Sequence, residues 1–151
     1  FEPHAASDFA DHVSMIVPVI AQLEQAASLA ALCDTAARLV RQMTAYDRVM
    51  VYRFHPDESG EVIAEDKDES LEPFKGLRYP AADIPQQARE LFRRNRFRVI
   101  ADMTADPVPI VPALGPENTP LDLSMSMLRA HSQMHLAYMR NMGVGASLAI
   151  A

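Results

Sequence analysis

The sequence predicts an α+β fold, with an antiparallel sheet flanked by helices. Three observations carry this prediction: two stretches of helical apolar spacing open the chain, two β-rich segments joined by a short turn follow, and an apolar β-like run ends it. Strands joined as a hairpin, with helices grouped apart from them, are typical of α+β domains. The last run, residues 146–151, has no later strand to pair with, so we expect the closing C-terminal strands of the sheet to be missing.

Length and composition indicate one globular domain. The 151 residues are 49% hydrophobic and 23% charged, which excludes a wholly disordered chain. We expect residues 1–7 to be a linker remnant and 8–151 to form the domain. A net charge of −6 argues against a general nucleic-acid binder, and no apolar run reaches the roughly 18–20 residues of a membrane span. We therefore expect a cytoplasmic protein with neither nucleic acid nor membrane as partner.

Two helices come first. Apolar residues recur at helical spacing over about 8–27, and a kink is expected at Pro18. Ser28 is a favourable N-cap for a second helix that runs to about Thr44. Its apolar stripe is expected to cover the sheet.

Two strands and a turn come next. Residues 46–54 alternate and are rich in β-branched and aromatic side chains, which indicates a strand. Residues 61–66 are interpreted as its antiparallel partner. The stretch 57–72 holds eight acidic residues. We interpret them as a solvated face, because the regular spacing of a calcium loop is missing.

The C-terminal half mixes short elements with one long loop. Residues 84–95 are expected to be helical and 98–101 to form a short strand. Five prolines within 104–120 predict a long loop, which in a compact domain often serves a function. One or two helices are expected over 121–142, and Gly143 is expected to end the last of them.

Enzyme motifs are missing from the sequence, so we expect no catalysis by this chain. There is no G-x-S-x-G, H-E-x-x-H, P-loop or G-x-G-x-x-G. The only cysteine, Cys33, lies in an apolar stripe and is expected to be a buried, inert thiol. His131 and His135 have i, i+4 spacing, which leaves open a two-histidine metal site, a core or capping role, or a place facing a ligand. We favour the readings without metal.

Arginines and aromatic residues point to a ligand. Arg98 leads into a predicted strand and Arg129 lies in a Met- and Leu-rich segment predicted to be helical. Each guanidinium either pairs with one of the twenty acidic residues or binds a ligand carboxylate. Together with Tyr52, Tyr79 and Phe92 they would suit a large planar ligand that carries carboxylates.

Three ordered segments resemble one family. Residues 79–89 (YPAADIPQQAR) resemble the P-A-S-D-I-P-x-Q-A-R signature of phytochromes. Residues 46–54 (YDRVMVYRF) resemble their first core strand, and 121–144 resemble their chromophore helix region. The likeness spans about residues 28–151 and is to the GAF chromophore-binding domain of bacterial phytochromes.

The resemblance implies a site for a bilin, biliverdin in a bacterial member. Arg98, Arg129 and Ser147 would bind its propionates, and His135 would lie beside the central rings. The backbone carbonyl of Asp83 would face the pyrrole nitrogens, while its side chain couples the pigment to a neighbouring domain. The remaining implied site residues either pack on the rings, line the pocket of the ring that rotates or flank the histidine: Ile84, Pro85, Tyr52, Tyr79, Phe92, Ser132 and Met134.

The chain departs from the signature at several positions. Met134 stands where plant and cyanobacterial members carry the bilin-linking cysteine, and Cys33 matches no attachment position. Ala82 replaces the serine of the motif, and Ala149 stands where a second propionate-binding serine is often found. We therefore expect a bilin held without a covalent bond in this chain.

The resemblance implies a photosensory module for red and far-red light, in which the bilin isomerises. Its parent would be a bacterial signalling protein with PAS and PHY domains, whose output could be a histidine kinase. The N-terminal helix is expected to join a parallel homodimer bundle. The alternative is a regulatory or dimerising GAF module that binds no bilin.

Overall fold

The computed structural model describes residues 6–127 and 129–151, with side chains from Ser14 onward. The chain divides after Asp83 into two compact units, each described here by itself. We call them the N-terminal unit and the C-terminal unit. Both mix helices with antiparallel strands, as expected for an α+β domain.

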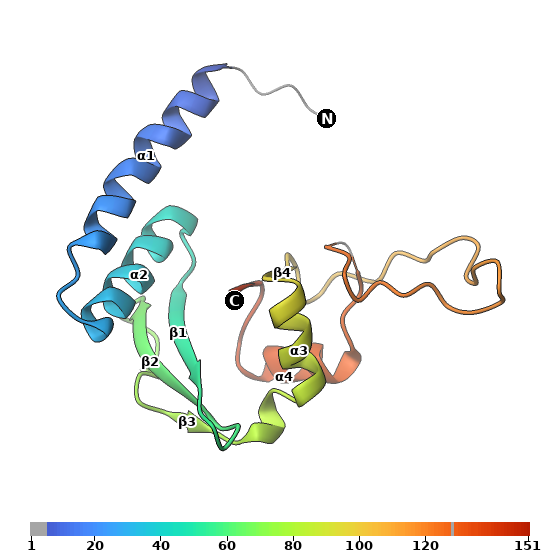
Figure 1. Ribbon diagram of the computed structural model, residues 1–151. Helices are drawn as coiled ribbons and strands as arrows, with labels where there is room; N and C mark the ends of the chain where they lie inside the picture. The colour runs from blue at the N-terminus through green and yellow to red at the C-terminus, as the bar shows by residue number, and fades with distance from the viewer. Residues whose placement is uncertain (1–5, 128) are drawn as a thin grey trace. The chain divides into compact units, whose positions relative to one another are not determined.

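In the N-terminal unit, helix α2 packs against the hairpin of β1 and β2, and β3 extends the sheet in the order β1-β2-β3 (Figure 1). The antiparallel pairing predicted for the first two strands is confirmed. The short β3 lies beyond the two strands that the sequence predicts for this unit. The elements are α1 (Ala6–Glu24), α2 (Leu29–Thr44), β1 (Arg48–Phe54), β2 (Gly60–Lys67), β3 (Arg78–Tyr79) and the 3-10 turn η1 (Ala81–Asp83).

Helix α2 begins where the sequence predicts. The Ser28 hydroxyl oxygen accepts a hydrogen bond from the backbone N–H of Ala31 at 3.1 Å, which satisfies one of the free donors of the first turn. The helix ends at a left-handed residue, Ala45, whose N–H donates to the carbonyl of Arg41 at 2.8 Å.

The apolar stripe of α2 covers the sheet only in part. Two small side chains four residues apart, Cys33 and Ala37, are buried on one side of the helix, and Leu39 is buried on another. Leu29 and Met43, which the stripe also contains, are exposed in this unit. The sheet presents Ala64 and Val62 at full burial, so a face of small residues lets the helix approach closely.

One acidic residue departs from the predicted solvated face. The Glu65 side chain is only 4% exposed and its Oε1 lies 2.6 Å from Nη1 of Arg48. Its Oε2 accepts from the backbone N–H of Phe74 at 2.8 Å and of Lys75 at 3.0 Å, while Arg48 stacks 3.7 Å from the centroid of the Phe74 ring. Glu65 therefore anchors the loop between β2 and β3.

The C-terminal unit is built around one two-stranded antiparallel sheet, β4-β5. Ile100, Met103 and Leu136 form its core, and Met139 and Val144 pack against them. Gly143, at φ 73°, follows the last helix as predicted. The elements are α3 (Gln86–Arg94), β4 (Phe97–Ile100), α4 (Gln133–Asn141) and β5 (Ser147–Ile150).

One helix prediction in this unit was wrong, and another was correct to within two residues. The described residues of 121–132 form no helix, so α4 is much shorter than the 121–142 stretch expected. There the Oδ1 of Asp122 accepts from the N–H of Ser124 at 2.9 Å and closes a turn. Helix α3 starts after Pro85, which precedes its first turn, because proline offers no N–H to the helix and restricts Ile84 before it.

The described helices include none that is both long enough and apolar enough to cross a membrane.

Candidate functional site

Four basic side chains gather in the C-terminal unit, and we call them the cationic cluster: Arg98, Arg129, His131 and His135. Arg98 lies on β4, and His135 lies in the first turn of α4. The Ser132 hydroxyl caps that helix by accepting from the N–H of His135 at 3.3 Å. A serine between the two histidines thus fixes where the helix starts.

Arg98 carries the sharpest signal in the cluster. Its guanidinium carbon lies 5.3 Å from the centroid of the Phe92 ring. Its Nη1 is buried and has no hydrogen-bond partner among the described residues. A buried donor without an acceptor loses its hydrogen bonds to water and gains none in the protein, which costs free energy. Such donors are rare in folded proteins. An anionic ligand would supply the missing acceptor.

Arg129 is oriented by backbone. Its Nη1 donates to the carbonyl of Ser126 at 2.8 Å, which leaves its other donors available to a ligand. The sequence predicted a helix around Arg129, but the described residues beside it are not helical. The backbone carbonyl of a turn, and not a helix face, holds this guanidinium.

The cluster is short of negative charge. Burial first, and then the charge of Arg129, lower the pKa of Arg98. Burial also leads the causes that lower the pKa of His131 and of His135, and the two guanidiniums add to it. No carboxylate of the described chain contributes to these shifts. The salt bridges found among the described residues include neither Arg98 nor Arg129, and the lowered pKa values of both histidines favour their neutral form at pH 7.

His131 and His135 lie close without sharing a helix. Their ring centroids are 6.1 Å apart, although His131 precedes the Ser132 cap. No group of three or more His, Cys, Asp or Glu side chains placed for a metal occurs among the described residues. The two rings lie beside like charges, which suits a ligand-facing role better than a metal site. Sequence reasoning left His131 out of the site, and its spacing from His135 was the signal.

The strand register adds Ser147. Arg98 pairs with Ala149 across the sheet, and Ile100 pairs with Ser147. Side chains two residues apart on a strand share one face, so Ser147 lies on the same face as Arg98. The alanine at 149 places only a methyl group directly opposite Arg98.

The positions of the other predicted site residues in this unit give a weaker indication of a ligand. The carbonyl of Ile84 accepts from Nε of Arg89 at 2.7 Å, so a side chain of α3 holds the backbone just before the helix begins. Pro85 is exposed, and Met134 is 84% exposed. The ring of Phe92 lies beside the guanidinium of Arg98, so the structure places Phe92 next to a cation.

In the N-terminal unit, three rings form what we call the aromatic cluster: Tyr52, Phe54 and Tyr79. The Tyr52 ring meets Phe54 edge to face at a centroid distance of 5.2 Å and Tyr79 at 6.1 Å. The sequence singled out both tyrosines but missed Phe54, which its spacing of two residues from Tyr52 on one strand could have indicated. Asp83 is exposed at the end of η1.

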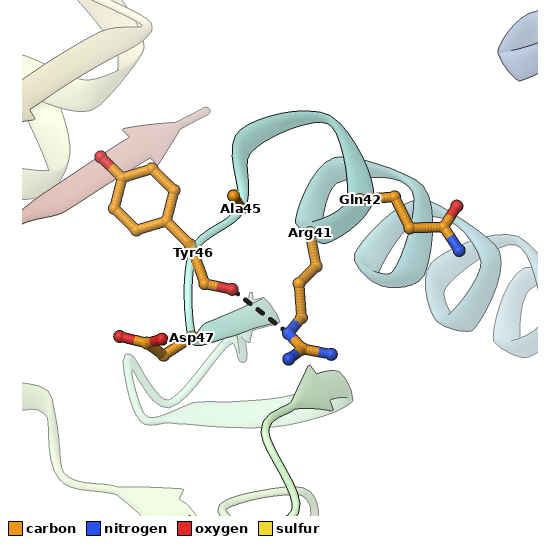
Figure 2. A pocket seen from close by; sticks show the side chains of 5 residues that line it. All are labelled: Arg41, Gln42, Ala45, Tyr46 and Asp47. Atoms are coloured by element: carbon orange, nitrogen blue, oxygen red, sulfur yellow. Dashed lines mark hydrogen bonds between the residues drawn. The ribbon is translucent and has the colours of Figure 1, made fainter.

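A hollow at the junction of α2 and β1 is a poorer candidate (Figure 2). Arg41 is the cation in it, and its Nε donates to the carbonyl of Tyr46 at 3.2 Å. Its terminal nitrogens pair with Asp66 at 3.4 Å and Asp68 at 3.9 Å. A guanidinium so occupied offers little to an anionic ligand.

Comparison with known proteins was made by sequence family, by sequence and by structure. The GAF domain family matches residues 28–151. Phytochrome-like protein Cph1 of Synechocystis is 46% identical over 154 residues, covering 99% of this chain and 21% of the relative. The bacteriophytochrome of Pseudomonas aeruginosa is 49% identical over 134 residues, covering 88% of this chain and 18% of the relative. The chain thus spans about a fifth of these relatives.

Solved structures agree. The chromophore binding domain of Stigmatella aurantiaca phytochrome P1 superposes with a TM-score of 0.88 at 39% identity, covering 99% of this chain and 49% of that one. The bacteriophytochrome RpBphP3 from R. palustris gives a TM-score of 0.90 at 40% identity, covering 99% of this chain and 30% of that one. The resemblance noted in the sequence is confirmed, and so is the fold class.

Proposed function

Because this chain belongs to the GAF domain family and is similar to phytochromes, we propose that it is a bilin-binding photosensory domain of a bacterial phytochrome. The observation that carries the proposal is the buried, unpartnered Nη1 of Arg98 beside a second guanidinium, Arg129. A bilin has two carboxylates, so it would supply the negative charge that the cationic cluster lacks.

We assign roles by the chemistry of each group. Arg98 and Arg129 bind the propionates, with the Ser147 hydroxyl as a further donor. His135, kept neutral by its surroundings, can both donate and accept a hydrogen bond at the central rings. The Asp83 carbonyl accepts from the pyrrole nitrogens, and its exposed carboxylate is free to report the pigment state to another domain.

The remaining residues shape and support the site. Tyr52 and Tyr79 line the pocket of the ring that rotates, and Ile84 and Pro85 pack on the rings. Phe92 supports Arg98 through its ring face, in line with their 5.3 Å separation. Ser132 sets the position of His135 through the helix cap, and Met134 flanks that histidine.

A bound bilin would supply the absorption of red light and an isomerisation at one methine bridge. The protein then biases two states of the domain, and a charged group such as Asp83 reports the difference. We propose biliverdin as the pigment and a non-covalent mode of binding within this chain. Its one cysteine, Cys33, is buried on α2, and Met134 cannot form a thioether link. Pigment bound to this chain should therefore leave it in denaturant.

The direct test is an absorption spectrum after mixing with biliverdin. Wild-type protein should develop a red-shifted band, and the double variant Arg98→Ala with Arg129→Ala should lose it. Arg93→Ala is the matched control, since Arg93 is exposed and its Nη1 lies as far as 4.0 Å from Oε2 of Glu90. A wild-type protein without the band would refute the proposal.

A second function has its own observation. Several apolar side chains of α1 and of the start of α2 are exposed in this unit, and we refer to this set as the exposed face: Met15, Ile16, Val17, Ile20, Leu29 and Leu32. We propose that it contributes to a homodimer bundle. A regulatory or dimerising GAF module would need this face and no pigment. Sedimentation of the double variant Val17→Glu with Ile20→Glu tests this proposal. If the variant dimerises like wild type, these side chains take no part in the dimer.

Further domains and the cellular setting belong to the same proposal. The relatives are about five times as long as this chain, so we propose PAS and PHY domains of one polypeptide as its partners. We propose a cytoplasmic location, and we assign catalysis to an output domain of the parent protein, not to this chain.

A further inference from the structure

Gly60 stands at the centre of the aromatic cluster. It is the first residue of β2, and it is buried. Its partner on β1 is Phe54 and its partner on β3 is Tyr79, so two of the three aromatic residues flank it across the sheet. The third, Tyr52, lies two residues before Phe54 on β1.

A side chain at position 60 has no room. A Cβ built on Gly60 would overlap the Oη, Cε1 and Cζ atoms of Tyr52. The tyrosine ring therefore lies directly over the glycine backbone, in the space that any other residue would fill. Since only the hydrogen of glycine fits, the ring position and the residue identity depend on each other.

Backbone conformation does not explain this glycine. Gly76 and Gly143 have φ values of +88° and +73°, which favour glycine by themselves, whereas Gly60 lies outside that left-handed region. Alanine could adopt the backbone at position 60 without strain. Gly145 also lies outside that region but has open space around its Cα. Close approach of Tyr52 is thus the reason for Gly60.

We propose that Gly60 is a positioning residue that seats the Tyr52 ring against Phe54 and Tyr79. This inference rests on the proposed function, in which Tyr52 and Tyr79 line the pocket of the rotating ring. A β-carbon at position 60 would push the Tyr52 ring off the strand and change the wall that this ring of the pigment meets. Gly60 would then affect photochemistry without touching the pigment.

The first experiment needs no pigment. The sequence has no tryptophan and four tyrosines, so near-ultraviolet circular dichroism reports chiefly on tyrosine packing. Gly60→Ala should lose much of the tyrosine signal, and Gly145→Ala should keep it. An unchanged signal in Gly60→Ala would overturn the inference.

A double variant separates the clash from general damage. In a Tyr52→Ala background the added methyl group has room, so Gly60→Ala should no longer lower the unfolding midpoint, and it should lower it clearly in wild type. Equal destabilisation in both backgrounds would mean that Tyr52 is not what position 60 accommodates. This arm also decides the matter if the single variant folds poorly.

The final experiment uses biliverdin. Gly60→Ala should bind it, since the cationic cluster is untouched, but should photoconvert with a several-fold lower yield than wild type and Gly145→Ala. Equal yields would refute the positioning role. A wild-type protein that binds no biliverdin would instead refute the proposed function, and the pigment-free experiments would still decide the packing of Tyr52 on Gly60.

Discussion

The two units use their charges differently. In the N-terminal unit guanidiniums meet carboxylates: Arg48 pairs with Glu65 at 2.6 Å, and Arg41 with Asp66 at 3.4 Å. In the C-terminal unit Arg98 has a buried nitrogen without a partner among the described residues, and the charge that lowers its pKa is that of another arginine. Paired charges hold loops and helix ends in place, whereas an unpaired, partly buried cation indicates a missing ligand.

The largest expected effect comes from breaking a buried pair. Glu65→Ala leaves Arg48 without its carboxylate and frees two backbone N–H groups of the following loop. Removing one partner of a buried pair costs about 3 kcal/mol of unfolding free energy. Urea unfolding measures it, with Asp34→Ala as control, since the Asp34–Lys75 pair is half exposed and should contribute below about 1 kcal/mol. Equal losses would remove the distinction between structural and surface pairs.

Capping serines offer a milder comparison between the units. Ser28→Ala and Ser132→Ala should each cost about 1 kcal/mol, because each removes an acceptor from the first turn of a helix. Only Ser132→Ala should also weaken biliverdin binding, since it frees the start of the helix that holds His135. A titration of both variants with biliverdin checks this. Equal binding would show that the cap does not serve the site.

The unpaired cation should behave in the opposite sense to Glu65. Arg98→Met removes a buried donor that has no acceptor and replaces it with an unbranched apolar side chain of similar stem. Pigment-free protein should keep its stability or gain up to about 1 kcal/mol. Thermal unfolding without biliverdin measures this. A loss comparable to that of Glu65→Ala would mean that Arg98 serves the fold and not a ligand.

The smallest effect concerns pH. The pKa of His135 is lowered, so above the ordinary histidine pKa of about 6.5 it is neutral in both the folded and the unfolded state. As the pH falls below that value the unfolded state takes up a proton first, and stability is lost until the folded-state pKa is passed. NMR titration of the ring protons follows this directly.

Ligand and charge should both move this titration. A bound dicarboxylate offsets the guanidiniums, so biliverdin should raise the pKa of His135 and of His131. Arg98→Met should raise them as well, because it removes a like charge. A pKa that stays fixed in both experiments would exclude electrostatic coupling within the cationic cluster.

Local patterns explain which predictions succeeded. The Ser28 cap, the hairpin of β1 and β2 and the helix end at Gly143 depend on residues a few positions apart. They can therefore be predicted from the local sequence. The prediction of helix over 121–142 was wrong for the described residues of its first half. Asp122 closes a turn with Ser124 there, and apolar spacing alone cannot show that a side chain will compete with the helix for backbone donors.

The family, the order of the main elements and the choice of Arg98, Arg129 and His135 as candidate ligand groups follow from patterns in the sequence. The burial and the hydrogen-bond partners of these groups depend on tertiary contacts. The tertiary structure buried Glu65 in a stretch that reads as solvated, left Arg98 without an acceptor and laid Tyr52 over Gly60. Burial and partnership depend on contacts between residues far apart in the chain, and only folding sets them.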